Sequence, residues 1–362
     1  MTAENFYLKT EEKVVFELRA LYGKFGYLPY KMTKFEEYDL YAKNKDFLVS
    51  ENIITFTDGG KLMALKPDVT LSIIKNAGDS GVKKVYYNEN VYRLSKSTDS
   101  FKEIMQAGLE CIGDIDEYQV FEVLYLAGLS LKAVSEDFTL SVSDVKIVND
   151  ILDVAQLSNA SKREVLIALS SKNENLIKEV FIRENASQKC LDAVLSLCSI
   201  YGDYNKAKVV LEKLDFGEEF NLYVKNFLAI INSLNDTELK DRVKVDFSVI
   251  SDGKYYNGTI FSGFISGIAT AVLSGGRYDV LMKRMGKSSG AIGFAVYLDQ
   301  IVGLGSKNSN VVDVLLIYEK GANLLKVKEE VFKLTSKGLK VFATSSNDTG
   351  VKYRELKELK NL

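Results

Sequence analysis

Glu110 is the first residue of this sequence whose setting suggests chemistry. It falls in IMQAGLECI (104–112), which we expect to form a strand, and it stands between the apolar residues Leu109 and Cys111. A carboxylate that turns inward from such a strand needs a partner, because a buried unpaired charge is costly. This requirement favours a binding role for Glu110 over a chance placement.

Four segments hold the polar residues that could act together with it. They are LKPDVT (65–70), VYRLSKSTDSFKEIMQAGLECIG (91–113), SDGKYYNGTIF (251–261) and LSGGRYDVLMKRMGKSSGAIGFAVYLDQI (273–301). The sequence has no histidine, which excludes Ser-His-Asp triads, Cys-His dyads, histidine bases and histidine-ligated metals. Chemistry must therefore come from carboxylates, lysine, arginine, tyrosine, serine, threonine or the backbone, and we expect no metal and no cofactor.

The cysteines and the apolar segments indicate where the protein works. Cys111, Cys190 and Cys198 fit no CxxC pair and no even-numbered disulfide framework, so we expect a reducing cytoplasm. The N-terminal MTAENFYLKTEEK has no basic start followed by an apolar run, and predicts no secretory signal. The uncharged stretch 257–276 approaches transmembrane length, but its glycine, serine, threonine and β-branched residues favour two buried strands instead.

The composition is that of an ordinary globular protein. The chain has 362 residues, 46% of them hydrophobic and 27% charged, and a net charge of −2. That length allows two or three domains, and the small net charge gives no general attraction to nucleic acid or anionic lipid. Residues 161–244 hold equal numbers of basic and acidic residues, which is not typical of a segment that binds RNA phosphates.

Apolar spacing and turn residues predict an α+β chain. We expect helices at 9–25 and 116–134, a mostly helical region at about 145–240, and a short helix that begins at Asp68 or Thr70 and ends near Lys75. We expect strands at 53–56, 63–65, 85–93, 104–112 and 138–142, with a polar loop of about ten residues between the third and fourth, and further strands in 245–302.

The boundaries follow from a polar linker. GLGSKNSN (303–310) separates a core at 1–302, which includes the helical insert, from a small C-terminal unit at 311–362. That unit reads as strand, helix (322–336) and strand (339–344), followed by a charged tail. At this size it is marginal as an independent domain.

The four polar segments, in their order and spacing, resemble the catalytic core of histidyl-tRNA synthetase. GGRYD (275–279) followed by AIGFA (291–295) carries most of this resemblance, which covers about residues 5–302. It implies the fold of the class II aminoacyl-tRNA synthetases, an antiparallel six-stranded sheet with flanking helices. The C-terminal unit is about half of the anticodon-binding domain that a synthetase needs, so we do not expect tRNA as a partner.

The resemblance also implies a histidine pocket. In the family, an acidic residue, a threonine and a glutamine hold the substrate α-ammonium group, and the matching residues here are Asp68, Thr70 and Gln106. A glutamate and a tyrosine of a tyrosine pair contact the two imidazole nitrogens, and these match Glu110 and Tyr256. Three ammonium donors suit one carboxylate and neutral acceptors, and two polar groups at opposite nitrogens select a polar ring.

Several of these assignments leave an alternative open. Asp68 can simply cap a helix. Tyr255 and Tyr256 alternate on a strand, so we expect only one of them to face the pocket and the other to join the core. Arg93 either binds a ligand carboxylate or pairs with a neighbouring acid. Tyr255 and Arg93 nevertheless belong to the expected histidine site.

The residues that would activate an amino acid are missing. Aminoacyl-adenylate formation places negative charge on a phosphate, which synthetases neutralise with arginines. At the matching positions this sequence has Ser251 and Gln300, and Ser95 replaces a glutamate that follows the one retained arginine. Tyr297 replaces a small residue. Each lost charged contact weakens transition-state stabilisation, so we expect no adenylation.

A synthetase-like body with a histidine pocket and no chemistry resembles the regulatory subunit of ATP phosphoribosyltransferase. KPDVT (66–70) is similar to the Asp-containing motif typical of that family. The resemblance implies a non-catalytic subunit that activates a short catalytic subunit and senses histidine in the first step of histidine biosynthesis. It further implies a homodimer within a hetero-oligomer. The absence of histidine suits a protein needed when histidine is scarce, although compositional bias also explains it.

Two alternatives stay open at this stage. One is a divergent histidyl-tRNA synthetase, which ATP–pyrophosphate exchange would reveal. The other is an orphan synthetase-like enzyme that activates another amino acid.

Overall fold

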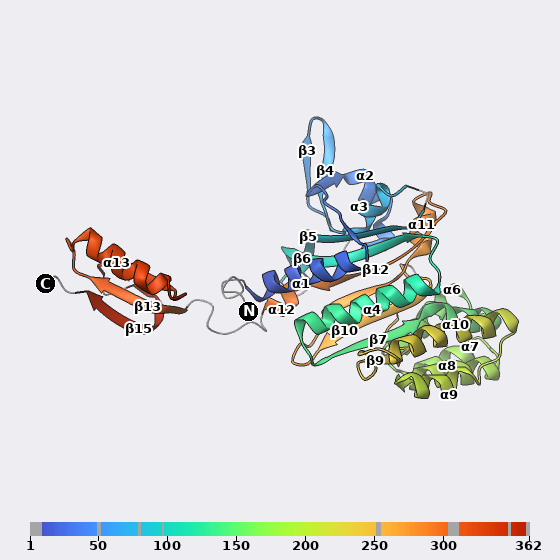
Figure 1. Cartoon of the computed structure of the whole chain (residues 1–362). Coiled ribbons are helices and arrows are strands. Elements are labelled where there is room, and N and C mark those ends of the chain that lie inside the picture. The colour runs from blue at the N-terminus through green and yellow to red at the C-terminus, as the bar shows by residue number, and fades with distance from the viewer. Residues whose placement is uncertain are drawn as a thin grey trace. The chain divides into compact units, whose positions relative to one another are not determined.

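The computed structural model describes residues 9–48, 52–78, 81–95, 98–250, 255–302, 311–346 and 349–359 (Figure 1). The chain divides into two units. The larger spans Val14–Ile301, and the smaller holds the N-terminal residues up to Lys13 and the residues from Val302 onward. The predicted linker at 303–310 lies outside the described residues.

One sheet organises the larger unit. Its six central strands are antiparallel to their neighbours. In spatial order they are β5 (Lys83–Ser95), β6 (Ser100–Gly113), β12 (Gly290–Tyr297), β11 (Leu273–Arg277), β10 (Thr259–Ile265) and β7 (Phe138–Asp144). The predicted six-stranded antiparallel sheet is therefore confirmed, and the uncharged stretch 257–276 holds the two strands expected of it.

Three short strands widen this sheet in the part of the chain that the structure describes. β1 (Leu28–Pro29) lies parallel to β5, and β9 (Val243–Asp246) lies parallel to β7. β8 (Tyr201–Gly202) adds to β9. The complete sheet is therefore mixed at both ends.

The hairpin of β5 and β6 is longer than the sequence indicated. Pairing continues to Ser95 and Ser100, so the ten-residue loop expected between these strands is wrong. The ends of the hairpin are polar, which hides the alternation that marks a strand. Cross-strand hydrogen bonds connect them instead, since Asn90 and Tyr92 both donate to Glu103.

Helices cover one face of the sheet. α1 (Thr10–Lys24), α4 (Glu117–Val134) and α12 (Leu298–Ile301) pack their apolar sides into the main core with the sheet (Figure 1). α4 begins at a capping box, because Asp116 accepts from the backbone N–H of Gln119 while the Gln119 side chain accepts from the Asp116 backbone N–H. The helices predicted at 9–25 and 116–134 are confirmed.

The predicted helical region follows β7. It consists of α5 (Val145–Val154), α6 (Asn159–Ser170), α7 (Glu174–Arg183), α8 (Gln188–Ser199), α9 (Tyr204–Leu211) and α10 (Glu218–Asn235). Their buried residues belong to the same core as the sheet, so this insert is packed onto the unit from which it emerges. None of the described helices combines the length and the apolar character that crossing a membrane requires.

A second apolar cluster lies on the other face of the sheet. It holds buried residues of α2 (Tyr38–Ala42), the 3-10 helix η2 (Lys45–Phe47), α3 (Thr70–Lys75) and α11 (Asp279–Arg284). A small antiparallel sheet with the order β2-β4-β3 joins it through β4, and its strands are β2 (Phe35–Glu37), β3 (Thr55–Asp58) and β4 (Lys61–Leu65). The predicted strand–turn–strand–helix order of 53–75 is confirmed.

The C-terminal unit contains one more strand than predicted. β13 (Val311–Tyr318), α13 (Leu324–Thr335) and β14 (Val341–Thr344) form the expected β-α-β arrangement. The charged tail is not a free extension, because β15 (Lys352–Leu359) pairs with β13 in parallel. Arg354 pairs with Asp313 at 3.0 Å, and Lys357 pairs with Glu330. These ion pairs replace the apolar alternation that would have predicted the strand.

Candidate functional site

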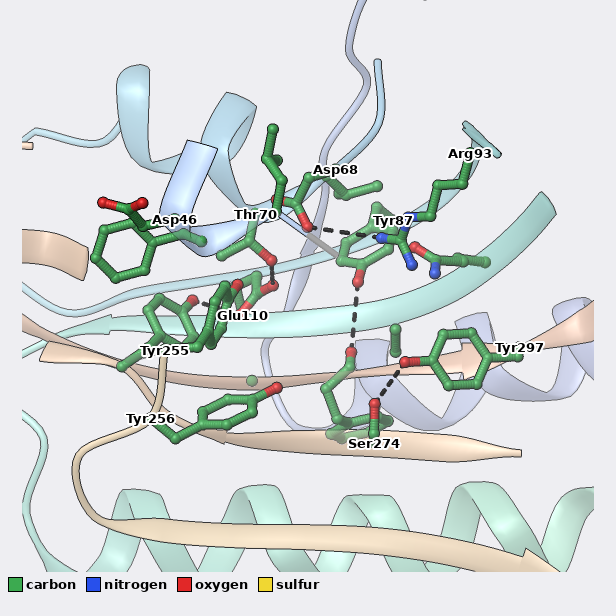
Figure 2. A pocket seen from close by; sticks show the side chains of 18 residues that line it. Asp46, Asp68, Thr70, Tyr87, Arg93, Glu110, Tyr255, Tyr256, Ser274 and Tyr297 are labelled. Carbon is green, nitrogen blue, oxygen red and sulfur yellow. Dashed lines mark hydrogen bonds and ion pairs between the residues drawn. The ribbon is translucent and has the colours of Figure 1, made fainter. Parts of the chain in front are cut away.

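A cavity of about 330 Å³ lies on the sheet face that carries α3 and α11 (Figure 2). Its walls come from β5, β6, β11 and β12, from the turn before α3, and from the segment before β10. The structure brings all seven residues predicted for a histidine site to this cavity. They are Asp68, Thr70, Arg93, Gln106, Glu110, Tyr255 and Tyr256.

Strand geometry explains why Gln106 and Glu110 face the same space. They are four residues apart on β6, and side chains at even spacing share one face of a strand. Leu109 and Cys111 point the other way, into the main core. Gln106 is 3% exposed and Glu110 is 2% exposed, so both polar groups are removed from bulk water.

Glu110 has two protein partners. Thr70 donates its hydroxyl to Oε1 at 2.8 Å, and Tyr278 donates its hydroxyl to Oε2. Burial raises the pKa of Glu110 to about 8, although both hydrogen bonds act in the opposite direction. The partner that the sequence required for this carboxylate is therefore a pair of hydroxyl groups.

A glycine makes room for that carboxylate. Gly293 on β12 lies directly opposite Glu110 on β6. A Cβ atom at Gly293 would stand 1.8 Å from Glu110 Oε2, a separation that side chains cannot adopt. Gly276 plays a similar part for Tyr256, whose ring carbon Cδ1 would lie 2.6 Å from a Cβ there. The absence of a side chain at these two glycines therefore makes the room that Glu110 and Tyr256 occupy.

Asp68 both caps a helix and pairs with a cation. Its Oδ1 accepts from the backbone N–H of Leu71 at 2.9 Å, at the start of α3. Its Oδ2 lies 3.7 Å from an Nη atom of Arg93, whose Nε donates to the Pro67 carbonyl at 2.7 Å. Burial raises the pKa of Asp68, while the Arg93 charge opposes that shift. Arg93 is thus paired with a neighbouring acid and also lines the cavity.

The expectation that only one tyrosine of the pair would face the cavity is wrong. Tyr255 and Tyr256 both line it, and their ring centroids are 4.7 Å apart (Figure 2). The pair precedes β10, which begins at Thr259, so strand alternation does not apply to it. The irregular backbone allows both rings to turn to the same side.

Several cavity residues were not predicted as ligands. Tyr278 belongs to the GGRYD motif, but only the structure shows its hydroxyl on Glu110. Tyr87 precedes Arg93 by six residues on β5, and residues at even spacing share one face of a strand, so the alternation of side chains could have predicted that Tyr87 lines the cavity. Ser274 and Tyr297 also line the cavity and are hydrogen-bonded to each other.

The lining has more acidic than basic residues, although two of its carboxylates are already paired with arginines, Asp46 with Arg284 and Asp68 with Arg93. Among the described residues that line the cavity, Asp46, Asp68 and Glu110 are acidic and Arg93 is the one Lys or Arg. Gln300 lies on α12, where its side chain accepts from Thr270 at 3.0 Å. Ser251 falls outside the described residues. The part of the chain that the structure describes has no cluster of three or more potential metal-ligating side chains.

Comparisons with known proteins agree with the resemblance that the four polar segments indicated. Residues 7–301 match the family model described as histidyl-tRNA synthetase. This chain belongs to that family. The chain is also 28% identical to an ATP phosphoribosyltransferase regulatory subunit of Acetivibrio thermocellus, over 79% of this chain and 70% of the relative. It is 27% identical to the protein of the same name from Clostridium kluyveri, over 100% of this chain and 96% of the relative.

Solved structures show the same fold. A Bacillus halodurans protein described as an ATP phosphoribosyltransferase regulatory subunit/histidyl-tRNA synthetase superposes with a TM-score of 0.78, at 21% identity, over 98% of this chain and 94% of that one. A histidyl-tRNA synthetase from Nostoc superposes with a TM-score of 0.72, at 16% identity, over 94% and 83%. The fold class and the resemblances inferred from the four segments are therefore confirmed.

Proposed function

We propose that this chain is the non-catalytic regulatory subunit of an ATP phosphoribosyltransferase, and that it binds histidine in the cavity as a feedback effector. The observation that carries this proposal is a contrast within one cavity. Polar groups that suit a free amino acid are buried together, whereas the described lining offers a single cation, Arg93. The names of the relatives support the same assignment.

The cavity suits histidine in size and chemistry. About 330 Å³ is at the lower end of the roughly 300–1,000 Å³ typical of small-molecule sites. Asp68, Thr70 and Gln106 offer a carboxylate and two neutral acceptors to an α-ammonium group. Glu110 retains acceptor capacity beyond its two hydroxyl donors, because an ionised carboxylate has roughly four acceptor sites. That capacity suits an imidazole N–H.

The same lining does not suit adenylation. Phosphoryl chemistry needs fixed positive charge at the developing negative charge of the transition state. Arg93 is the single cation of the described lining, and only part of its guanidinium group is engaged, by Asp68 and by the Pro67 carbonyl. The relatives' description as regulatory subunits supports a role in which this chain contributes binding and another chain contributes chemistry.

The proposed partner is the short catalytic subunit of ATP phosphoribosyltransferase. A solved ATP phosphoribosyl transferase complex from Thermotoga maritima includes a chain with this fold, which superposes with a TM-score of 0.62 at 20% identity over 80% of this chain and 97% of that one. A homodimer of this chain within the hetero-oligomer is part of the proposal. Exposed Leu28 on β1, at one end of the sheet, and exposed Phe16 on α1 offer apolar surface for it.

Regulation by histidine requires two states of the complex. A ligand shifts an equilibrium only by its difference in affinity for the two states. Histidine must therefore bind more tightly when the catalytic subunit is in its inactive arrangement. By reciprocity, the catalytic subunit's state changes the affinity for histidine by the same factor.

Co-purification with the short catalytic subunit tests the proposal. We expect a stable complex whose phosphoribosyltransferase activity exceeds that of the catalytic subunit alone and falls when histidine is added. ATP–pyrophosphate exchange with histidine should stay at the level of a protein-free control. Measurable exchange, or a complex whose activity does not respond to histidine, would contradict the proposal.

A further inference from the structure

We propose that Tyr297 closes the carboxylate end of the cavity, so that the site accepts a free amino acid and rejects derivatives with an extended carboxyl group. This inference rests on the proposed function, because it takes histidine as the ligand. Tyr297 is the residue that would set the length of that ligand.

Strand alternation places the tyrosine at the edge of an otherwise open floor. Gly293, Ala295 and Tyr297 share the cavity face of β12, and all three line the cavity. The two small residues leave space above the backbone, whereas the third fills it with a ring. Tyr297 lies directly opposite Gln106 on β6, which is one of the residues expected to hold the α-ammonium group.

A hydrogen bond fixes the ring in that position. The Tyr297 hydroxyl bonds to the hydroxyl of Ser274 on the neighbouring strand β11 (Figure 2). Ser274 and Tyr256 also line a second cavity, of about 390 Å³, next to β10. The Tyr297–Ser274 hydrogen bond therefore lies at the boundary between the two cavities.

The direction of a bound amino acid follows from the residues at the two ends. Figure 2 shows Arg93 and Tyr297 at one end of the cavity and Asp46 and Tyr255 at the other. An imidazole at Glu110 and an ammonium group at Asp68 direct the carboxyl group toward Arg93 and Tyr297. A carboxylate fits beside the guanidinium there, whereas a bulky ester or amide meets the tyrosine ring.

Two amides of histidine separate size from charge. Histidinamide and histidine β-naphthylamide both lack the carboxylate charge, so their difference in affinity reports the space beyond the carboxyl group. We expect calorimetric titration of the full chain to give histidinamide weaker binding than histidine. The naphthylamide should bind at least about tenfold more weakly than histidinamide, since a filled site resists added bulk.

Substitution of the tyrosine assigns that difference to its ring. In Tyr297→Ala the gap between the two amides should fall below about threefold, whereas Tyr297→Phe, which keeps the ring, should retain most of it. An equal affinity of the unaltered chain for both amides would refute the inference without any variant. A gap that persists in a folded Tyr297→Ala chain would refute it as well.

The outcome of the histidine titration separates the two proposals. If the unaltered chain does not bind histidine, the proposed function fails and this inference fails with it. If histidine binds but the amides behave as equals, the inference alone is wrong.

Discussion

Replacing Glu110 by glutamine tests the cavity at its most buried charge. Glutamine has nearly the same shape, but it keeps only one of the two oxygens that accept from Thr70 and Tyr278. It removes the negative charge offered to the ligand and places an NH2 group where the other oxygen stood, and the hydroxyl group on that side can turn to accept from it. Because the residue is 2% exposed, water cannot reach the ligand to compensate for the missing charge.

The expected loss follows from the type of hydrogen bond. A hydrogen bond to a charged group contributes about 1.5–3 kcal/mol, which corresponds to a fall in histidine affinity of about 10- to 150-fold. We expect Glu110→Gln to show this loss by calorimetry at pH 8.5, and Glu110→Ala to lose at least as much. Inhibition of the complex by histidine should shift by the same factor.

The pH dependence makes the argument specific to this carboxyl group. Its pKa in the free chain is about 8, and an imidazole N–H favours the ionised form. Below pH 8 binding must therefore release a proton, at a cost of about 1.4 kcal/mol for each pH unit. The affinity advantage of the unaltered chain over Glu110→Gln should accordingly shrink about tenfold per unit as the pH falls from 8 to 6.

A matched control lies on the same strand. Glu103 on β6 is exposed and bonds only to Asn90 and Tyr92 among the described residues, so Glu103→Gln should leave affinity and inhibition unchanged. Histidine itself titrates in the same way in every experiment. Comparing the pH profiles of the unaltered and Glu103→Gln chains with that of Glu110→Gln therefore isolates the effect of the buried carboxyl group. If Glu110→Gln retains the affinity and inhibition of the unaltered chain while folded, the effector does not use this cavity.

Three further substitutions test two neighbours of this group and one buried carboxyl group outside the cavity. Thr70→Val should weaken histidine binding about fivefold by calorimetry, since it removes a donor to Glu110 worth about 1 kcal/mol. Gly293→Ala should abolish histidine binding and lower the free energy of unfolding by about 1–3 kcal/mol in urea, whereas Gly23→Ala on α1, where nothing lies within 4 Å, should not destabilise the chain. Burial raises the pKa of Asp144 to about 6, so the folded chain favours the protonated carboxyl group, and the stability that this group contributes is lost as the pH rises from about 4 to 6. Asp144→Asn cannot ionise, so between pH 4.5 and 7 its free energy of unfolding in urea titrations should exceed that of the unaltered chain by about 1–3 kcal/mol.

The sequence could predict the position of a side chain where that position depends on a single strand or helix. Strand parity places Glu110 on the face opposite Leu109 and Cys111, and the structure buries it there with the partners that an inward-facing carboxylate needs. Residue type left Asp68 and Thr70 as candidates for the start of α3, and in the structure the Asp68 side chain accepts from the backbone N–H of Leu71 in its first turn. The same parity argument failed for Tyr255 and Tyr256, because it assumed a strand that in fact begins at Thr259. Parity is useful only where the backbone is extended.

Contacts between distant strands required the structure. Nothing near Gly293 in the chain indicates that it must lack a side chain, because the atom it would strike belongs to Glu110, which the pairing of β12 with β6 places opposite it. The hydroxyl of Tyr278 reaches the same carboxylate from beyond β11.

The sequence could mark Tyr297 only as a departure from a family pattern. Register gives that departure a physical meaning, since it sets the ring opposite Gln106 and within hydrogen-bonding reach of Ser274. A small residue at this position would leave the floor open from Gly293 through Ala295 to the end of β12, next to the boundary with the second cavity. With tyrosine there, the same sheet encloses a space of amino-acid size. Strand pairing, rather than any local motif, therefore determines how long a ligand this cavity can hold.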